Sequence, residues 1–190
     1  EPPQQAARLL EVEAKVPLNA LYKTWHCGGR LHPAYHATDL MTEIMGSGSS
    51  SRLHQRLVKE KRLFSSIACY HFGSIDPGML VMEGKLLEGV NMAKAEAALN
   101  EEVEKLVSDG VTENESQKAK NKTESLLAFE DMSLMNRANN LAFYALLNDA
   151  NMMNTEWEKY EQVSAQQIKE TAAAILQPHN CNTMHYFARL

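Results

Sequence analysis

Two histidines four residues apart are the first candidates for chemistry in this chain. His32 and His36 could share one face of a helix, and imidazoles at that spacing are common metal ligands. Neither a glutamate nor a third ligand follows at a suitable spacing. His32 also precedes Pro33, which biases its backbone away from the helical conformation. The sequence therefore favours structural histidines over a metal site.

The zinc-peptidase motifs H-E-x-x-H and H-x-x-E-H are both absent, and the other five histidines form no strong zinc-binding spacing. Cys27, Cys69 and Cys181 are odd in number and far apart, which argues against a disulfide framework and a C-x-x-C site. Cys27 and Cys69 fall in apparent strands, where a free cysteine behaves as a small core residue. We expect this chain to hold no zinc.

A Gly/Ser loop at residues 46–50 suggests a third kind of chemistry, because backbone N–H groups at the start of a helix bind anions. The Gly-Lys-Ser/Thr ending of a nucleotide phosphate loop is missing. A serine cap for the following short helix, which carries Leu53 and Leu57, explains the loop well. The sequence does not predict a phosphate loop.

Alternation of apolar and polar residues predicts the strands that position these groups. Residues 10–16 place Leu and Val opposite charged residues, which predicts one face on a core and the other in water. Residues 20–28 predict a second strand, and we expect both in one antiparallel sheet. Residues 63–72 and 79–87 predict a hairpin, because D-P-G between them is turn chemistry. Residues 182–189 predict a closing strand.

Periodicity, caps and breakers predict the helices. A helix is expected to open at His32-Pro33 and to end near Gly46. The other predicted helices cover 92–110, 112–130, 134–145, a short segment around Trp157, and 164–178. Capping boxes are expected where Thr112 precedes Glu115 by three residues and where Ser164 precedes Gln167.

This order of elements predicts one α+β domain over 1–190, with helices on one face of an antiparallel sheet. A chain of 190 residues with 44% hydrophobic and 23% charged residues can bury one good core. The net charge of −5 excludes a strongly basic nucleic-acid footprint, and no apolar run reaches the roughly 20 residues of a membrane span. The composition fits a soluble protein of the cytoplasm, the periplasm or an organellar matrix and does not choose among these compartments.

We expect the second face of the sheet, or one edge, to remain available for another domain. Aromatic residues in the predicted strands supply more apolar surface than a solvated sheet face carries: Trp25, Phe64, Tyr70 and Phe72. The chain also lacks an initiator Met, so we expect it to be the C-terminal fragment of a longer protein or a mature form.

Residues 46–70 carry a resemblance to a known family. The matching residues follow the small-residue loop and are Ser51-Arg52-Leu53, Leu57, Lys59-Glu60-Lys61 and Leu63. This order resembles the consensus of the pitrilysin/insulinase family of zinc peptidases, inverzincins related to the mitochondrial processing peptidase. The resemblance extends over about 10–188 and is to the second-type, C-terminal domain, which carries no zinc motif.

The resemblance implies a zinc held by a partner domain or subunit of the same family, with no cofactor in this chain. In active members the second-type domain supplies an Arg and, seven residues later, a Tyr that bind substrate and the oxyanion. Alignment places these residues at Val58 and Ser65, and neither can perform the role. The resemblance therefore assigns no catalytic residue to this chain. Arg52, Ser51 and Ser65 remain candidate substrate contacts, with a structural role for Arg52, pairing an acid or capping a helix, as the favoured alternative.

Three hypotheses for function remain. The first is a non-zinc-binding domain of a zinc metalloendopeptidase that forms part of the substrate chamber and contacts peptide substrate. The second is a catalytically inert structural domain of the same family that only assembles with a partner. The third is an unrelated α+β binding module. In each case the isolated chain is expected to be inactive, because it lacks both H-x-x-E-H and the Arg/Tyr pair.

Overall fold

The structure, a computed structural model, describes residues 4–189. Within that range, five strands form one sheet: β1 (Arg8–Ala14), β2 (Ala20–Cys27), β3 (Phe64–His71), β4 (Gly78–Leu86) and β5 (Cys181–Ala188). The helices of the same range are α1 (Tyr35–Gly46), η1 (His54–Glu60, a π-helix), α2 (Met92–Asp109), α3 (Glu113–Glu130), α4 (Leu134–Leu146), α5 (Met152–Glu161), α6 (Ala165–Ile175) and η2 (Pro178–Asn180, a 3-10 turn). The predicted α+β class is confirmed.

The strand order across the sheet is β1-β5-β2-β4-β3. The predicted β3–β4 hairpin is confirmed, and β2 pairs with β4 and β5 in antiparallel fashion. The first two strands do share a sheet, but β5 lies between them and pairs with β1 in parallel. The sheet is therefore mixed at one edge, since the last strand of the chain returns to its first.

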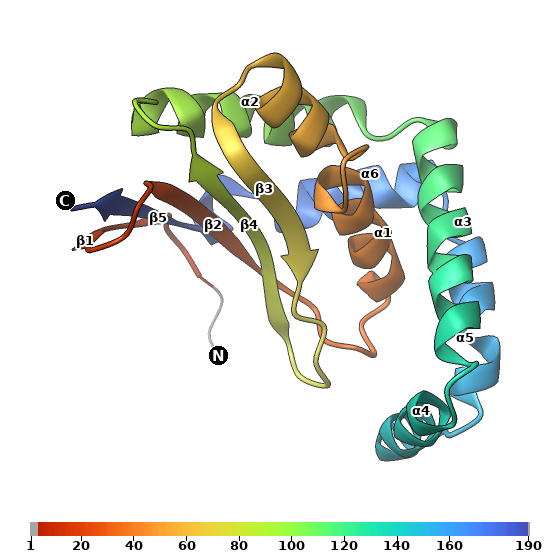
Figure 1. Cartoon of the computed structure of the whole chain (residues 1–190). Helices are drawn as coiled ribbons and strands as arrows, with labels where there is room; N and C mark the ends of the chain where they lie inside the picture. Colours follow the sequence, from red (N-terminus) through yellow and green to blue (C-terminus); the bar gives the residue numbers. More distant parts are fainter. Residues whose placement is uncertain (1–3, 190) are drawn as a thin grey trace.

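Helices α1, α2 and α6 lie on one face of the sheet (Figure 1). The strand side chains that point toward them form the core, and the largest fully buried ones are Leu21, Phe64, Leu80, Met82 and Leu86. Burial of these groups is the main stabilising term of such a fold. None of the helices in residues 4–189 lies over the opposite face in Figure 1, as the sequence predicts.

A glycine sets how closely α1 approaches the sheet. A Cβ on Gly46 would lie 1.9 Å from the backbone nitrogen of Cys69 in β3. Any side chain there would push α1 off the strand, because packed interiors leave no such space. The glycine that the sequence suggests as a cap thus closes the last turn of α1 and packs against β3.

The two predicted capping boxes are confirmed, but the serine cap predicted for the short helix after the Gly/Ser loop is wrong. That helix has no side-chain cap hydrogen bond, because the Ser51 hydroxyl donates to the Gly48 carbonyl instead. Thr112 and Glu115 form a reciprocal capping box at the start of α3, and Ser164 and Gln167 form another at the start of α6. Helix α1, however, begins at Tyr35 rather than at His32-Pro33. The Nδ1 atom of His32 accepts the Ala34 N–H at 3.1 Å, so these residues form a turn ahead of the helix.

Candidate functional site

Arg52 lies at the junction of η1, α2 and α3. Its Nε and Nη2 atoms donate to the two carboxylate oxygens of Glu115 at 2.6 and 2.7 Å, and Nη2 also donates to the Gly110 carbonyl at 2.9 Å. Gly110 ends α2 with a φ of 77°, and Glu115 caps α3. One guanidinium therefore ties the end of one helix to the start of the next.

The Arg52 guanidinium holds the pKa of Glu115 at about 2, although partial burial opposes this shift. The carboxylate also accepts the Thr112 N–H at 2.9 Å. Ser51, next in the chain, is buried, and its hydroxyl donates to the Gly48 carbonyl at 2.8 Å. Both residues thus make hydrogen bonds within the domain.

Ser65 lies apart from Arg52, on strand β3 beside an irregularity in the β3–β4 pairing. Its side chain is exposed, and its hydroxyl donates to the Lys85 carbonyl at 3.1 Å. Val58 is partly buried and packs against the hydrophobic core. The two positions aligned with the family's Arg and Tyr therefore present one exposed hydroxyl and no cationic group.

The second histidine of the candidate pair belongs to a buried ion cluster. The Nε2 atom of His36 lies 2.9 Å from Oε1 of Glu156 in α5, and the Arg30 guanidinium contacts the same oxygen. Burial alone would raise the pKa of Glu156, but hydrogen bonds from His36 and Arg30 hold it at about 2. Tyr144 of α4 accepts from Arg30 at 3.0 Å. The cluster fastens the helices to the loop that follows β2, and sequence analysis missed it because its members are far apart in the chain.

The described residues do not fit a zinc ion. Among residues 4–189, no group of three or more His, Cys, Asp or Glu side chains could hold a metal. The thiols of Cys27, Cys69 and Cys181 are free and buried, and burial raises the pKa of each. Raised thiol pKa values disfavour the thiolate, which is the form that binds metals and attacks substrates.

The uncovered face of the sheet carries apolar side chains in register. One cross-strand row runs through Leu10, Met184 and Tyr22 to Glu83. Other residues of the same face are Val12, Tyr186, Thr24, Val81, Tyr70, Met79 and Phe72, the last just beyond β3. Leu10 is 57% exposed and Phe72 is 56% exposed. An apolar sheet face of this extent is typical of a surface that another molecule covers.

Two predictions about side-chain direction are wrong. The apolar stripe of β1, including Leu10 and Val12, points to the uncovered face rather than to the core, because β5 sets its register. Trp25 and Phe64 point to the helices and are 2% and 0% exposed, so they do not contribute to the uncovered face. Tyr70 and Phe72 lie on that face as predicted. Alternation gives the two faces of a strand, but it does not say which face meets the core.

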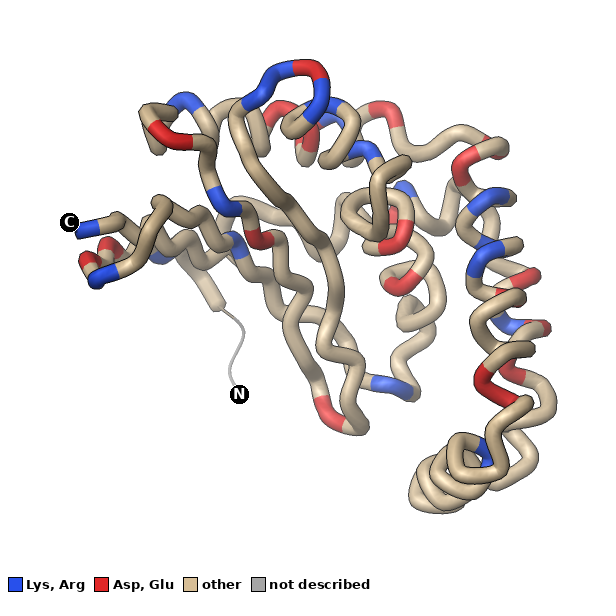
Figure 2. Tube along the Cα trace, viewed as in Figure 1, with Lys and Arg blue, Asp and Glu red and all other residues tan. Residues whose placement is uncertain are grey.

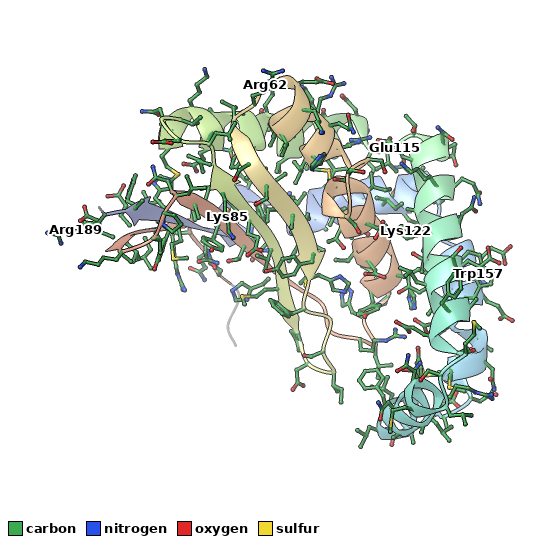
Figure 3. All side chains as sticks on the ribbon, in the orientation of Figure 1. Arg62, Lys85, Glu115, Lys122, Trp157 and Arg189 are labelled. Atoms are coloured by element: carbon green, nitrogen blue, oxygen red, sulfur yellow. The ribbon has the colours of Figure 1, made fainter. Side chains whose placement is uncertain are left out.

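A shallow cavity of about 280 Å³ opens on the uncovered face. Its lining includes Tyr22, Ala68, Glu83 and Lys85, the last labelled on β4 in Figure 3. The Tyr70 hydroxyl donates to Glu83 at 3.3 Å, and burial and the nearby carboxylate raise the pKa of Tyr70. A pocket with the Glu83 carboxylate, the Lys85 ammonium and the Tyr22 ring in its lining can accept the amide backbone and a side chain of a peptide. It holds no activated nucleophile.

Residues 1–123 match the profile of a family described as the peptidase M16 inactive domain. No curated protein matches the chain. None of the described helices combines the length and apolar character needed to cross a membrane.

Solved structures share the fold at low sequence identity. A protease from Helicobacter pylori superposes with a TM-score of 0.91 and 20% identity over 97% of this chain and 45% of its own. The inactive peptidase domain of a putative zinc protease from Bordetella parapertussis gives 0.83 and 19% over 91% and 94%. A chain of Complex III2 from Candida albicans gives 0.75 and 16% over 94% and 45%. This chain thus spans less than half the length of the Helicobacter protease.

Proposed function

The chain belongs to the family of peptidase M16 inactive domains, and we propose that it forms one wall of the substrate chamber of a zinc metallopeptidase. In this proposal the zinc is held by another domain or subunit, which supplies the water-activating chemistry. The chain supplies the uncovered face of its sheet. The observation that supports this role is the row of apolar and aromatic side chains, from Leu10 to Tyr22, that none of the described helices covers.

Extended peptides suit such a face. Cross-strand rows place apolar groups at regular spacing, and the cavity beside Tyr22 offers both a carboxylate at Glu83 and an ammonium at Lys85 for polar contacts. Of the contacts predicted from the sequence, Ser65 is the most accessible, whereas Ser51 and Arg52 are engaged within the domain. We keep all three as proposed substrate contacts, with Ser51 and Arg52 acting only if peptide displaces their present partners.

Photocross-linking tests the chamber wall. A benzoylphenylalanine in place of Tyr22, in the full-length protein together with its zinc-bearing domain or subunit, is expected to cross-link a bound peptide. The same group in place of Gln166, which is exposed on α6 on the helical side, is the matched control and is expected to remain unlinked. Absence of a Tyr22 cross-link in an assembly that still cleaves peptide would contradict the proposal.

A second candidate function is a structural domain that assembles with a partner and never meets substrate. Two observations favour it: Val58 and Ser65 replace the family's Arg/Tyr pair, and the fold is shared with a chain of Complex III2 from Candida albicans. An H-x-x-E-H motif elsewhere in the full-length gene product, or in an adjacent gene, favours the peptidase. Stable assembly with a partner that lacks the motif would favour the structural domain.

A further inference from the structure

A second hollow lies on the helical side of the molecule, remote from the uncovered sheet face. It measures about 440 Å³ and is lined by the end of α1, the Ser-rich loop 47–51, residues 52–56 and the first half of α3. Four cationic side chains line it: Arg52, Arg56, Lys118 and Lys122. Two carboxylates, Glu43 and Glu115, also line it. Figure 2 shows the Lys positions along α3. The lining therefore has an excess of positive charge.

The two lysines reach from α3 across the hollow to the serine loop. The Nζ atom of Lys118 donates to Ser50 Oγ at 2.6 Å, and that of Lys122 donates to Ser47 Oγ at 2.8 Å. Lys122, labelled in Figure 3, also pairs with Glu43 of α1. Each ammonium carries three donors, and each serine hydroxyl that accepts from a lysine keeps its own proton to donate. All four side chains line the same hollow and therefore keep donors available to a molecule bound there.

Of the two lining acids, Glu43 pairs with Lys122, and neither pairs with Lys118. Arg52 engages both oxygens of Glu115, and Arg56 pairs with Glu60 outside the hollow at 2.8 Å. Among the described residues, Ser50 is the one hydrogen-bond partner of Lys118, and no carboxylate pairs with its ammonium. The Glu43 carboxylate is shared with Lys122. An oxygen-rich anion would complete the hydrogen bonds of Lys118 and compete with Glu43 for Lys122.

We propose that this hollow binds a phosphate group, held by the ammonium groups of Lys118 and Lys122 and by the hydroxyls of Ser47 and Ser50. The Ser-rich loop lacks the lysine of a nucleotide phosphate loop in its own sequence. Helix α3 supplies the cationic groups instead, because Lys118 and Lys122 lie 68 and 75 residues further along the chain than the serines they contact. The volume exceeds that of one phosphate, so inorganic pyrophosphate or a phosphorylated small molecule also fits. The lysines are exposed, so binding weakens as ionic strength rises.

Calorimetric titration of the protein with inorganic phosphate and with pyrophosphate, at low ionic strength, tests the site. Pyrophosphate is expected to bind more tightly, because it brings more charge to the same donors. Lys118→Gln and Lys122→Gln are each expected to weaken binding about fivefold, which corresponds to about 1 kcal/mol. The matched control is Lys120→Gln on the same helix, whose ammonium donates instead to the Glu161 carbonyl at 2.8 Å. Its affinity is expected to equal that of the wild type.

Glu43→Gln supplies a test in the opposite direction. It removes the carboxylate that competes for Lys122, so pyrophosphate binding is expected to strengthen about fivefold. Unchanged melting temperatures establish that all four variants fold. The proposal is overturned if neither anion produces binding heat, or if Lys120→Gln weakens binding as much as Lys118→Gln, because the effect would then reflect overall charge. It is also overturned if the Glu43 variant binds more weakly than the wild type.

Discussion

Arg52, the most conspicuous polar residue of the matched motif, bridges two helix ends in this domain. Its guanidinium satisfies the Gly110 carbonyl at the end of α2 and both oxygens of the carboxylate that caps α3. A planar fork with five donors suits this task better than a lysine would. Arg52 therefore makes the kind of contact that the sequence suggests for a structural role, because its guanidinium pairs with the carboxylate of Glu115.

Arg52→Ala tests whether this geometry or a substrate contact is the main role. We expect it to lower the free energy of unfolding by about 1.5–3 kcal/mol, because hydrogen bonds to a charged group are lost and Glu115 loses its cationic partner. Arg56→Ala, whose exposed pair with Glu60 is worth little, is the control. Thermal melts and peptidase kinetics of the full-length assembly are the measurements. A raised KM at an unchanged melting temperature would instead assign Arg52 to substrate binding.

Glu115 makes stability depend on pH. Its pKa falls from 4.5 to about 2 on folding, chiefly through Arg52, so the unfolded chain takes up a proton first as pH decreases. The stabilisation is therefore complete above about pH 5 and is lost as pH falls toward about 2, and we expect it to reach about 1–2 kcal/mol after solvent screening. The difference in melting temperature between wild type and Glu115→Gln should narrow over that range. A constant difference for Glu115→Gln over that range would contradict the assignment.

At the scale of elements, the contact between α1 and β3 determines how the helical layer sits on the sheet. The Cys69 backbone occupies the space where a Gly46 side chain would be. The neighbouring Ser47 lies outside the helix, with its hydroxyl directed to Lys122. Substitutions at the two adjacent positions should therefore have very different effects.

Gly46→Ala is expected to destabilise the fold by about 1–3 kcal/mol or more, because overpacking moves α1 or distorts β3. Ser47→Ala should change stability by less than about 0.5 kcal/mol, as surface substitutions generally do. Chemical denaturation of both variants measures the difference. Equal stabilities would show that α1 can move away from β3 at no cost.

Helix α4 lies far from the sheet, beyond the ends of α3 and α5 (Figure 1). Large apolar side chains of this region are exposed, namely Leu126, Phe129, Met132, Leu134, Met135, Leu141 and Leu146. Tyr144 and Leu147 are the buried anchors of the same segment. Exposed apolar surface at this density is a feature of chains that assemble with others. It is compatible with both candidate functions, which each require a partner.

At the scale of the whole molecule, the two-layer arrangement separates two surfaces. The helical side carries the cationic hollow, and the uncovered sheet face carries the apolar rows. A substrate chamber built from such domains would place the sheet faces inward and leave the hollow outside. The phosphate proposal is therefore independent of the peptidase proposal, and either can fail alone.

The isolated chain is expected to bind no zinc tightly and to cleave no peptide. The described residues contain no cluster of three possible metal ligands, and the sequence contains neither the H-x-x-E-H nor the H-E-x-x-H motif. Metal analysis after stripping and reloading with zinc is the measurement, together with a peptide cleavage assay. Val58→Arg combined with Ser65→Tyr should leave the isolated chain inactive for the same reason. Stoichiometric zinc with histidine ligands would refute this prediction.

Local features of the sequence determined much of the fold. Two-residue alternation located the strands, and helical periodicity with caps at Thr112 and Ser164 located most helices, because both signals depend on neighbours within one element. The resemblance in residues 46–70 led to the correct family. That 1–190 forms one domain remains a prediction.

Only the tertiary structure decided which strands are neighbours and which faces meet the core. The insertion of β5 between β1 and β2 joins residues that are more than 150 positions apart, and it turned the Leu10 stripe outward. The same long-range packing brought Arg30 to Glu156, Arg52 to Glu115, and Lys118 to Ser50. Such pairings depend on the free energy of the whole packed layer, and no local pattern in the sequence records them.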